Sequence, residues 1–288
     1  MNSATHNRYI LTLSCNDKPG IVAAVSGFLF EQEGFILESQ QFGDPSTGRF
    51  FMRTFFEAGD KAPNGKAIST IFTAVAEKFG MRWEIHNVQK KPRVLIMVSK
   101  EGHCLNHLLY RWESGQLPID IVAVGSNHPD LKHMADQYKV PFHYWPIHNG
   151  DKTKQESQIL ALTEELHIDV VALARYMQIL SNDMCQSLKG RAINIHHSFL
   201  PSFKGANPYR QAYDRGVKII GATAHYVTAD LDEGPIIEQE VIRVDHSYSS
   251  DELRQMGQDV ESRVLFRALQ YHVEHRVLLN GQKTVVFR

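Results

Sequence analysis

The stretch Ala192-Ile-Asn-Ile-His-His-Ser-Phe-Leu-Pro201 decides the fold of the larger part of this chain. It opens with a short run that is apolar except for Asn194 and then enters a Pro- and Gly-containing loop, a pattern that predicts a buried strand ending at His196. Asn194 and His196 are two residues apart, so their side chains share one face of that strand. Sites in open parallel sheets form at the carboxyl ends of strands, which makes this strand end a candidate site.

A second polar stretch, His225-Tyr-Val-Thr-Ala-Asp-Leu-Asp-Glu-Gly-Pro235, follows about thirty residues later. Ile219 to Val227 predicts another strand of the same geometry, and the loop from Thr228 to Pro235 can return Asp232 to His196. An amide N–H polarises a carbonyl oxygen, an imidazole exchanges protons, and a carboxylate fixes the imidazole tautomer or holds a water. Each residue alone is more often a cap or a turn residue. Together they predict acyl chemistry at a carbonyl.

The joint pattern, Asn-Ile-His-x-Ser-x-Leu-Pro and then His-x-Val-Thr-x-x-Leu-Asp-x-Gly-Pro, resembles the formyltransferase family that uses 10-formyltetrahydrofolate. The resemblance runs from about Arg93 to the C-terminus. It implies that Asn194, His196 and Asp232 are the catalytic residues, and that His225 supports the carboxylate loop. It also implies a folate substrate and no cofactor.

An apolar-rich segment, Val171-Ala-Leu-Ala-Arg-Tyr-Met-Gln-Ile-Leu-Ser181, covers a predicted buried strand and the loop after it. Core packing explains its first four residues, but it explains less well the apolar side chains that continue into the loop. By resemblance to the family, this segment lines the pterin pocket, with apolar side chains on the ring and main-chain groups at its edge. The residues that the resemblance assigns to folate are Met177, Gln178, Leu180, Ala229, Asp230 and Leu231.

Beyond Pro92 the sequence alternates between short apolar strands and helical stretches such as Lys154 to Leu166. This alternation predicts an α/β domain over residues 93–288 with a Rossmann-like, mostly parallel, doubly wound sheet, and a long helix from Ser249 to His275. The polar segment 87–92, which ends in proline, is the predicted linker. The predicted strands are Val94–Val98, Ile121–Val124, Phe142–Pro146, Val170–Ala174, Ala192–Ile195 and Ile219–Val227.

Residues 1–86 follow a different pattern, in which apolar alternation and helical periodicity predict the order βαββαβ, a ferredoxin-like domain. Gly34 is predicted to close the first helix. The predicted strands are Tyr9–Ser14, Phe35–Phe42, Arg49–Phe56 and Met81–Ile85. The apolar helix faces are predicted to hold Ile21, Val22, Val25, Phe28 and Leu29 in the first helix, and Ile68, Ile71, Phe72, Val75 and Phe79 in the second.

The turn Asp17-Lys-Pro-Gly-Ile-Val22 resembles that of the ACT domain, a small amino-acid-sensing module. The resemblance implies an effector site at Asp17, Gly20 and Ile21, methionine and glycine as effectors, and a homo-oligomer, either a dimer or a tetramer. A plain helix start also explains Pro19 and Gly20, in which case the domain only assembles the oligomer.

The amino-acid composition limits the classes of partner and the compartment that are expected. The chain has 288 residues, with 31 Lys and Arg against 32 Asp and Glu, and no dense basic run, so no nucleic-acid partner is expected. The widely spaced Cys15, Cys104 and Cys185 fit a reducing compartment rather than a disulfide framework. The N-terminus lacks a signal-peptide pattern and no apolar run reaches membrane-spanning length. These features predict a cytoplasmic protein that does not contact membranes.

The fifteen histidines raise the question of a metal. His103 and His107 are four residues apart on a predicted helix, but no third ligand follows at a suitable spacing, so no metal site is predicted. His197 alternates to the strand face away from His196, and a packing role is predicted for it.

The segment Ser99-Lys-Glu-Gly-His-Cys-Leu-Asn-His107 indicates which molecule can accept the formyl group. In glycinamide ribonucleotide formyltransferase a Gly- and Ser-rich loop cradles the substrate phosphate here, and Glu101 would disfavour a phosphate. The tRNA-formylating relatives carry an extra C-terminal domain, whereas this chain ends about fifty residues after Pro235. Water remains as the acceptor.

The chain therefore most closely resembles the formyltetrahydrofolate deformylases. The resemblance implies hydrolysis of 10-formyltetrahydrofolate to formate and tetrahydrofolate, which balances one-carbon folates and supplies formate for purine synthesis. Two alternatives remain at this point. One is transfer of the formyl group from the same folate to an amine, and the other is a folate-binding amino-acid sensor without turnover.

Overall fold

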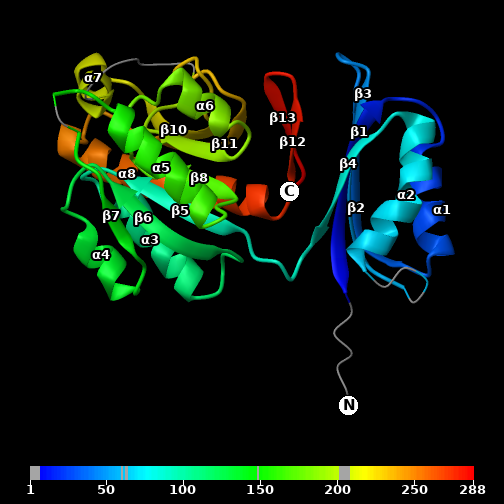
Figure 1. Cartoon of the computed structure of the whole chain (residues 1–288). Helices are drawn as coiled ribbons and strands as arrows, with labels where there is room; N and C mark the ends of the chain where they lie inside the picture. The colour runs from blue at the N-terminus through cyan, green and yellow to red at the C-terminus, as the bar shows by residue number, and fades with distance from the viewer. Residues whose placement is uncertain (1–6, 60, 62–63, 148, 201–207) are drawn as a thin grey trace. The chain divides into compact units, whose positions relative to one another are not determined.

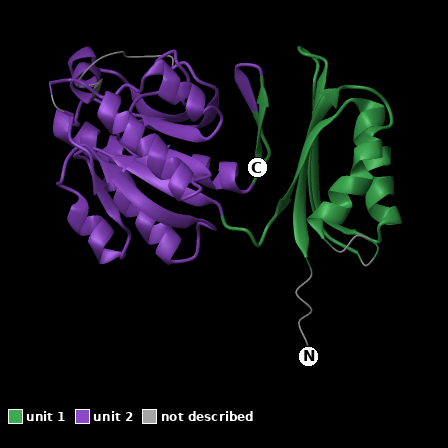
Figure 2. Ribbon diagram, viewed as in Figure 1, with its two compact units in different colours: residues 1–91, 275–280, 285–288 green, residues 92–274, 281–284 purple. Residues whose placement is uncertain are grey.

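Residues 7–59, 61, 64–147, 149–200 and 208–288 are described by the structure, a computed structural model. The chain divides into two compact units (Figures 1 and 2). The first holds residues 1–91 together with 275–280 and 285–288, and the second holds 92–274 and 281–284. The sequence-based boundaries placed all of 93–288 in one domain, so the units differ from that division at the C-terminal end.

The first unit contains a four-stranded antiparallel sheet with the order β2-β3-β1-β4. Its elements follow the predicted order βαββαβ. They are β1 (Arg8–Asn16), α1 (Ile21–Glu31), β2 (Phe35–Asp44), β3 (Arg49–Glu57), α2 (Gly65–Phe79) and β4 (Arg82–Asn87).

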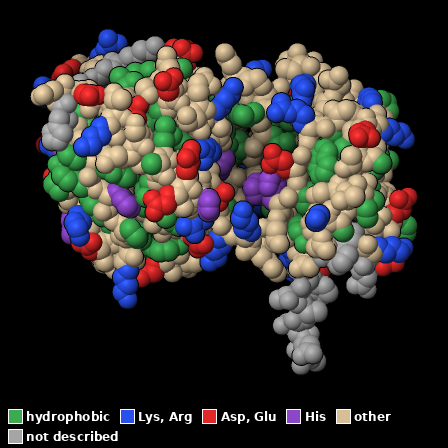
Figure 3. Space-filling view, in the orientation of Figure 1, with side chains coloured by type: hydrophobic (Ala, Val, Ile, Leu, Met, Phe, Trp, Pro, Cys, Tyr) green, Lys and Arg blue, Asp and Glu red, His purple; other side chains and the backbone are tan. Residues whose placement is uncertain are grey.

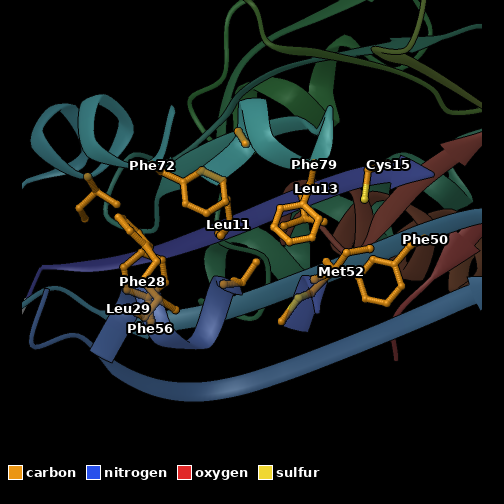
Figure 4. Packing of buried hydrophobic residues seen from close by; sticks show 14 of the residues in the cluster. Leu11, Leu13, Cys15, Phe28, Leu29, Phe50, Met52, Phe56, Phe72 and Phe79 are labelled. Atoms are coloured by element: carbon orange, nitrogen blue, oxygen red, sulfur yellow. The ribbon is translucent and has the colours of Figure 1, made fainter. Parts of the chain in front are cut away.

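Both helices of this unit pack their apolar stripes on one face of the sheet (Figure 4). Phe72 lies at the centre of this core, with its ring edge-to-face on Phe28 and on Trp83, each at a centroid distance of 5.0 Å. Val22 and Ile71 were predicted on the buried stripes but are exposed. Each lies one residue from a stripe defined by positions three or four apart, which turns it toward solvent.

The end of α1 differs from the prediction by one residue. Glu33, not Gly34, has the left-handed backbone conformation, with a φ of 59°. The Gly34 N–H then donates to the Leu29 carbonyl at 2.8 Å, as the second residue beyond the helix does in a Schellman motif.

The chain ends in a two-stranded sheet, β12 (Val277–Asn280) with β13 (Lys283–Val286), where the sequence indicated a single short strand. Most of these residues belong to the first unit. Asn280 Nδ2 donates to Asp44 Oδ2 at 2.7 Å, and Arg276 pairs with Glu38 at 3.2 Å. These long-range polar contacts explain why the end of the chain groups with β2 rather than with the second unit.

The second unit contains a seven-stranded sheet with the order β11-β10-β9-β8-β5-β6-β7. The five strands from β9 to β7 run parallel, as predicted, whereas β10 is antiparallel to β9 and β11 is antiparallel to β10. Its strands are β5 (Arg93–Val98), β6 (Asp120–Ser126), β7 (Phe142–Tyr144), β8 (Val170–Leu173), β9 (Ala192–His196), β10 (Ile219–Tyr226) and β11 (Ile236–Arg243). Its helices are α3 (His103–Glu113), α4 (Lys132–Gln137), α5 (Thr153–Glu165), α6 (Asn182–Ser187), α7 (Pro208–Arg215) and α8 (Ser250–Val273).

Helices cover both faces of this sheet. Ile159 of α5 and Met184 of α6 pack on side chains of β5 and β8, while α8 packs along β9, β10 and β11 together with α3 (Figure 1). The result is a three-layered α/β arrangement with a mostly parallel central sheet. Strand β11 escaped prediction because its polar residues interrupt the apolar run.

The surface in Figure 3 intersperses acidic and basic side chains, in keeping with the nearly balanced net charge of -1. No helix among the described residues is both long and apolar enough to cross a membrane.

Candidate active site

A pocket of about 380 Å³ opens in the second unit between the segment after β8, the end of β9, and β10 with its following loop. It collects nearly all residues that the sequence singled out. The predicted residues that line it are Asn194, His196, His225, Asp232, Met177, Gln178, Leu180, Ala229 and Leu231. Asp230 is not among the lining residues, and its carbonyl instead accepts a hydrogen bond from Thr228 Oγ1 at 3.0 Å.

The second strand of the site runs in the opposite direction from the one expected. Because β10 is antiparallel to β9, His225 lies directly across from Asn194, and the chain leaves β10 near the start of β9. The loop after β10 must therefore turn back along the sheet to bring Asp232 to His196. The Pro- and Gly-containing loop expected after His196 extends into residues 201–207, which lie outside the described residues.

Gly234 makes that return possible. A Cβ at this position would lie 1.7 Å from the Tyr226 carbonyl oxygen and 3.2 Å from His225 Nδ1. Only a residue without a side chain can approach the strand this closely. The Asp-Glu-Gly-Pro sequence is thus explained by the packing of the carboxylate loop onto β10.

Four polar side chains converge at the inner end of the pocket. His196 Nδ1 lies 3.3 Å from one oxygen of Asp232, and His225 Nε2 lies 3.6 Å from the other. Asn194 Nδ2 is 3.3 Å from His225 Nε2. The predicted amide, imidazole and carboxylate are therefore adjacent in space, with His225 joining Asn194 to Asp232.

The two histidines present different atoms to the pocket. His225 Nδ1 donates to the Tyr226 carbonyl oxygen at 2.9 Å, because that oxygen can only accept, and its Nε2 faces both the Asn194 amide and Asp232. His196 instead turns Nδ1 toward Asp232. Its Nε2 atom is buried and has no hydrogen-bond partner among the described residues. A buried, unpaired ring nitrogen that lines a pocket is positioned for a ligand.

The electrostatics favour a charged carboxylate. Hydrogen bonds from His196 and His225 hold the pKa of Asp232 well below its usual range, against the opposing effect of burial. Asp232 also has a left-handed backbone, with a φ of 59°. A non-glycine residue in this region costs free energy and is found often at functional sites.

The outer part of the pocket is apolar. Met177, Ile179 and Leu231 are exposed large side chains that line it together with Leu180 and Val227. The Met177 N–H donates to Ser99 Oγ at 3.0 Å, which anchors this segment to the end of β5. Such an apolar wall beside a small polar cluster is the usual composition of a small-molecule site.

His197 and Arg175 also line the pocket, and sequence reasoning did not place them there. His197 was predicted on the strand face away from His196, but it lines the same pocket, and its ring packs beside those of His196 and Tyr209. Burial, with the positive charge of Arg175 and the neighbouring His196, lowers the pKa of His197 to about 4. An arginine within an otherwise apolar strand-end loop was the signal available in the sequence for Arg175.

The histidines considered for a metal do not converge. His103 Nε2 lies 2.7 Å from Glu261 Oε2, whereas His107 Nε2 accepts from Arg111 at 3.3 Å. Within the described residues, His103, Cys104 and Glu261 do approach one another closely enough to share an ion. Burial and the negative charge of Glu261 raise the pKa of the Cys104 thiol well above its usual value, which disfavours the thiolate that a metal needs.

Glu101 of the loop before α3 is also fixed by protein groups. It forms an ion pair with Arg254 and accepts from Gln258 Nε2 at 2.5 Å. The carboxylate that was expected to oppose a phosphate is thus tied to α8.

Comparison with known proteins agrees with this geometry. Residues 92–269 match the formyl transferase family. The formyltetrahydrofolate deformylases of Corynebacterium sp. (strain P-1) and Bacillus subtilis (strain 168) are 50% and 48% identical to the chain, covering 98% and 96% of it and 98% and 93% of their own lengths. The crystal structure of formyltetrahydrofolate deformylase from Burkholderia mallei ATCC 23344 superposes with a TM-score of 0.93 at 51% identity, covering 98% of this chain and all of that one.

A more distant structural relative matches only part of this chain. The crystal structure of glycinamide ribonucleotide transformylase 1 from Symbiobacterium toebii superposes with a TM-score of 0.65 at 28% identity, and it covers 69% of this chain but 95% of its own. This share is close to the length of the second unit, whereas the deformylases match almost the whole chain. The chain belongs to the formyl transferase family and, within it, to the formyltetrahydrofolate deformylases.

Proposed function

We propose that the pocket binds 10-formyltetrahydrofolate and that Asn194, His196 and Asp232 direct water onto its formyl carbon. The chain hydrolyses this folate to formate and tetrahydrofolate. The observation that carries the proposal is the unpaired Nε2 of His196, held by Asp232 at the inner end of an apolar pocket. Transfer to an amine and binding without turnover, the two alternatives, are not favoured in a chain whose full length matches deformylases.

The chemistry follows from the groups present. Water adds to the formyl carbon, and Asn194 with protonated His196 stabilises the negative charge that develops on the formyl oxygen. Asp232 orients the water or accepts its proton, and its negative charge stabilises positive charge on the His196 ring during the reaction. The C–N bond then breaks, its electron pair passes to the folate nitrogen, and a proton returned to that nitrogen completes the release of formate.

The apolar wall of the pocket binds the folate in this proposal. We assign Met177, Leu180, Ala229 and Leu231 to the pterin ring, and the main chain of Gln178 to its polar edge. Asp230 lies outside the lining residues, so its part is to shape the loop rather than to contact the ring. The reaction needs no cofactor, because the aryl amine of the folate is already an adequate leaving group.

The activity is tested by incubating the purified chain with 10-formyltetrahydrofolate and no amine, and measuring formate and tetrahydrofolate. We expect the two products in equal amounts, and addition of glycinamide ribonucleotide should leave the formate yield unchanged. A formylated amine as the main product would contradict the proposal. The double variant of Asn194 and His196 to alanine serves as the inactive control.

We further propose that the first unit is an ACT domain with a ferredoxin-like fold. Support comes from its βαββαβ order and from the start of α1, where Gly20 precedes the helix with a φ of 95° and offers no capping side chain. The first N–H groups of α1 are therefore suited to a carboxylate such as that of methionine or glycine. Ile21 is buried, so only its main chain can take part, and Asp17 donates its N–H to the Gly48 carbonyl at 2.8 Å.

The same unit supports a homo-oligomer, as a dimer or a tetramer. Strand β2 forms an edge of the sheet, and it carries the exposed side chains of Phe35 and Phe42, with Phe30 of α1 nearby in sequence. Exposed aromatic residues on an edge strand favour association with another copy.

These two proposals are tested together in the full-length chain, because the C-terminal strands contribute to the first unit. Replacing Phe35 by glutamate should lower the molar mass found by light scattering and abolish any response of turnover to methionine or glycine. Arg82→Glu, an exposed change on β4, is the matched control. A monomeric wild-type chain, or an unchanged response in the Phe35→Glu protein, would contradict the interface.

A further inference from the structure

We propose that a buried network centred on Arg175 and Glu261 excludes acceptors larger than water from the formyl carbon, and so commits this fold to hydrolysis. The inference rests on the proposed function, since it concerns what can enter the pocket beside Asn194 and His196. Its members come from four places in the second unit. They are His103 at the start of α3, Arg175 after β8, Tyr209 of α7 and Glu261 of α8.

Glu261 is the centre of the network. Its side chain is 0% exposed, and both carboxylate oxygens are occupied. His103 Nε2 lies 2.7 Å from Oε2, Tyr209 donates its hydroxyl hydrogen to Oε1 at 2.5 Å, and Arg175 Nε lies 3.4 Å from Oε2. A buried carboxylate is tolerated only when it is paired and hydrogen-bonded, so His103, Tyr209 and Arg175 stabilise the Glu261 carboxylate. Arg175 contributes its charge, because its Nε and Nη1 make no hydrogen bond within the described residues.

Arg175 connects the network to the pocket, because it lines the pocket and reaches Glu261. Its backbone has a φ of 64°, a conformation that favours glycine. Local structure alone would therefore be better satisfied by glycine at this position. The presence of an arginine in a strained conformation indicates that its side chain is needed where it lies.

Tyr209 fills the space on the far side of Glu261. A Cβ at Gly257 of α8 would lie 2.1 Å from the Tyr209 hydroxyl, so the missing side chain of Gly257 makes room for the ring. The Tyr209 ring also neighbours His197, whose own ring centroid is 5.0 Å from that of His196. The network therefore extends up to the reactive imidazole.

An amine acceptor needs space that the folate does not fill. The apolar wall of Met177, Leu180 and Leu231 is assigned to the folate, and the basic lining residues outside the catalytic group are Arg175 and His197. Behind these two side chains lie Glu261, 3.4 Å from Arg175 Nε, and the Tyr209 ring, whose centroid is 6.5 Å from that of His197. In a related fold, that of the glycinamide ribonucleotide transformylases, an acceptor much larger than water must be admitted. Here only water fits beside the formyl group.

The test replaces Arg175 by glycine in the full-length chain, which opens the wall and relieves the left-handed backbone. Tetrahydrofolate, formate and N-formylglycinamide are measured separately, with glycinamide as the acceptor probe. The wild-type chain should give formate only. We expect the ratio of N-formylglycinamide to formate to rise by at least about tenfold in the variant, the scale on which pocket size discriminates between substrates.

Lys139→Gly is the matched control, because it removes a long cationic side chain from another left-handed position, with a φ of 58°, outside the pocket. Should Arg175→Gly fail to fold, Arg175→Lys retains the charge with a smaller head group and should shift the ratio in the same direction. A folded, folate-consuming variant whose products remain formate only would overturn the inference, as would a wild-type chain that formylates glycinamide. Failure of the proposed function is distinct, because the wild-type chain would then release no formate.

Discussion

Replacing Asp232 by asparagine should lower the kcat of folate hydrolysis by about 10³–10⁴ while the chain stays folded, as expected when a carboxylate that orients a catalytic imidazole becomes an amide. Asparagine has nearly the same shape and tolerates the left-handed backbone found at this position, with its φ of 59°. It cannot accept a proton from water or hold the charge on His196. The loss should therefore fall on turnover rather than on folding.

The matched control is Asp230→Asn, two residues away in the same loop but outside the pocket lining. Steady-state kinetics and thermal unfolding of both variants separate chemistry from stability. A loss of less than tenfold in Asp232→Asn, or an equal loss in the control, would contradict the assignment. Since its histidine partners hold the pKa of Asp232 well below the usual range, this carboxylate should remain charged at about pH 4, where an unperturbed aspartate is half protonated.

Much of the proposed catalytic group followed from local sequence pattern. Asn194 and His196 were placed on one strand face because residues two apart in a strand share a face, and the turn residues around Gly234 indicated a loop that could return. Both inferences depend only on neighbouring residues. The structure places Asp232 3.3 Å from His196, as the adjacency of the motifs predicted.

Strand direction could not be predicted in the same way. An apolar run such as Ile219 to Val227 indicates a strand, but its pattern is the same whichever way the strand runs. The expected parallel arrangement was therefore wrong for β10, which is antiparallel to β9 and lays His225 across from Asn194. That pairing depends on the path of the connection between the two strands.

The groups that escaped prediction are those defined by distant partners. In the sequence, nothing distinguishes Glu261 from the other charged residues of α8. Only the fold brings it to His103, 158 residues earlier in the chain. The same holds for Asp44 and Asn280, which are joined across 236 residues. His197 was placed by strand alternation on the face away from His196, but it follows the last residue of β9, where alternation no longer holds, and it lines the same pocket.

Replacing Asn194 by alanine should lower kcat by about 10²–10³, which corresponds to roughly 3–4 kcal/mol of lost transition-state stabilisation, the usual effect of removing one oxyanion donor. The folate KM should change little, because the amide is used mainly after water has added. His225 would remain held by the Tyr226 carbonyl at 2.9 Å, so the rest of the site should keep its geometry. Asn182→Ala, an exposed change on α6, is the control.

The decisive comparison is between kcat and KM, measured with tetrahydrofolate formation as the readout. A group that only binds the ground state raises KM and leaves kcat intact, whereas a donor to the developing oxyanion lowers kcat and kcat/KM by the same factor. An Asn194→Ala protein with unchanged turnover and a raised KM would make the amide a folate-binding group and leave His196 as the sole donor to the oxygen. The orientation of Asn194 favours a loss in kcat. Its Nδ2 lies 3.3 Å from His225 Nε2 and is thereby fixed beside the carboxylate rather than along the apolar wall.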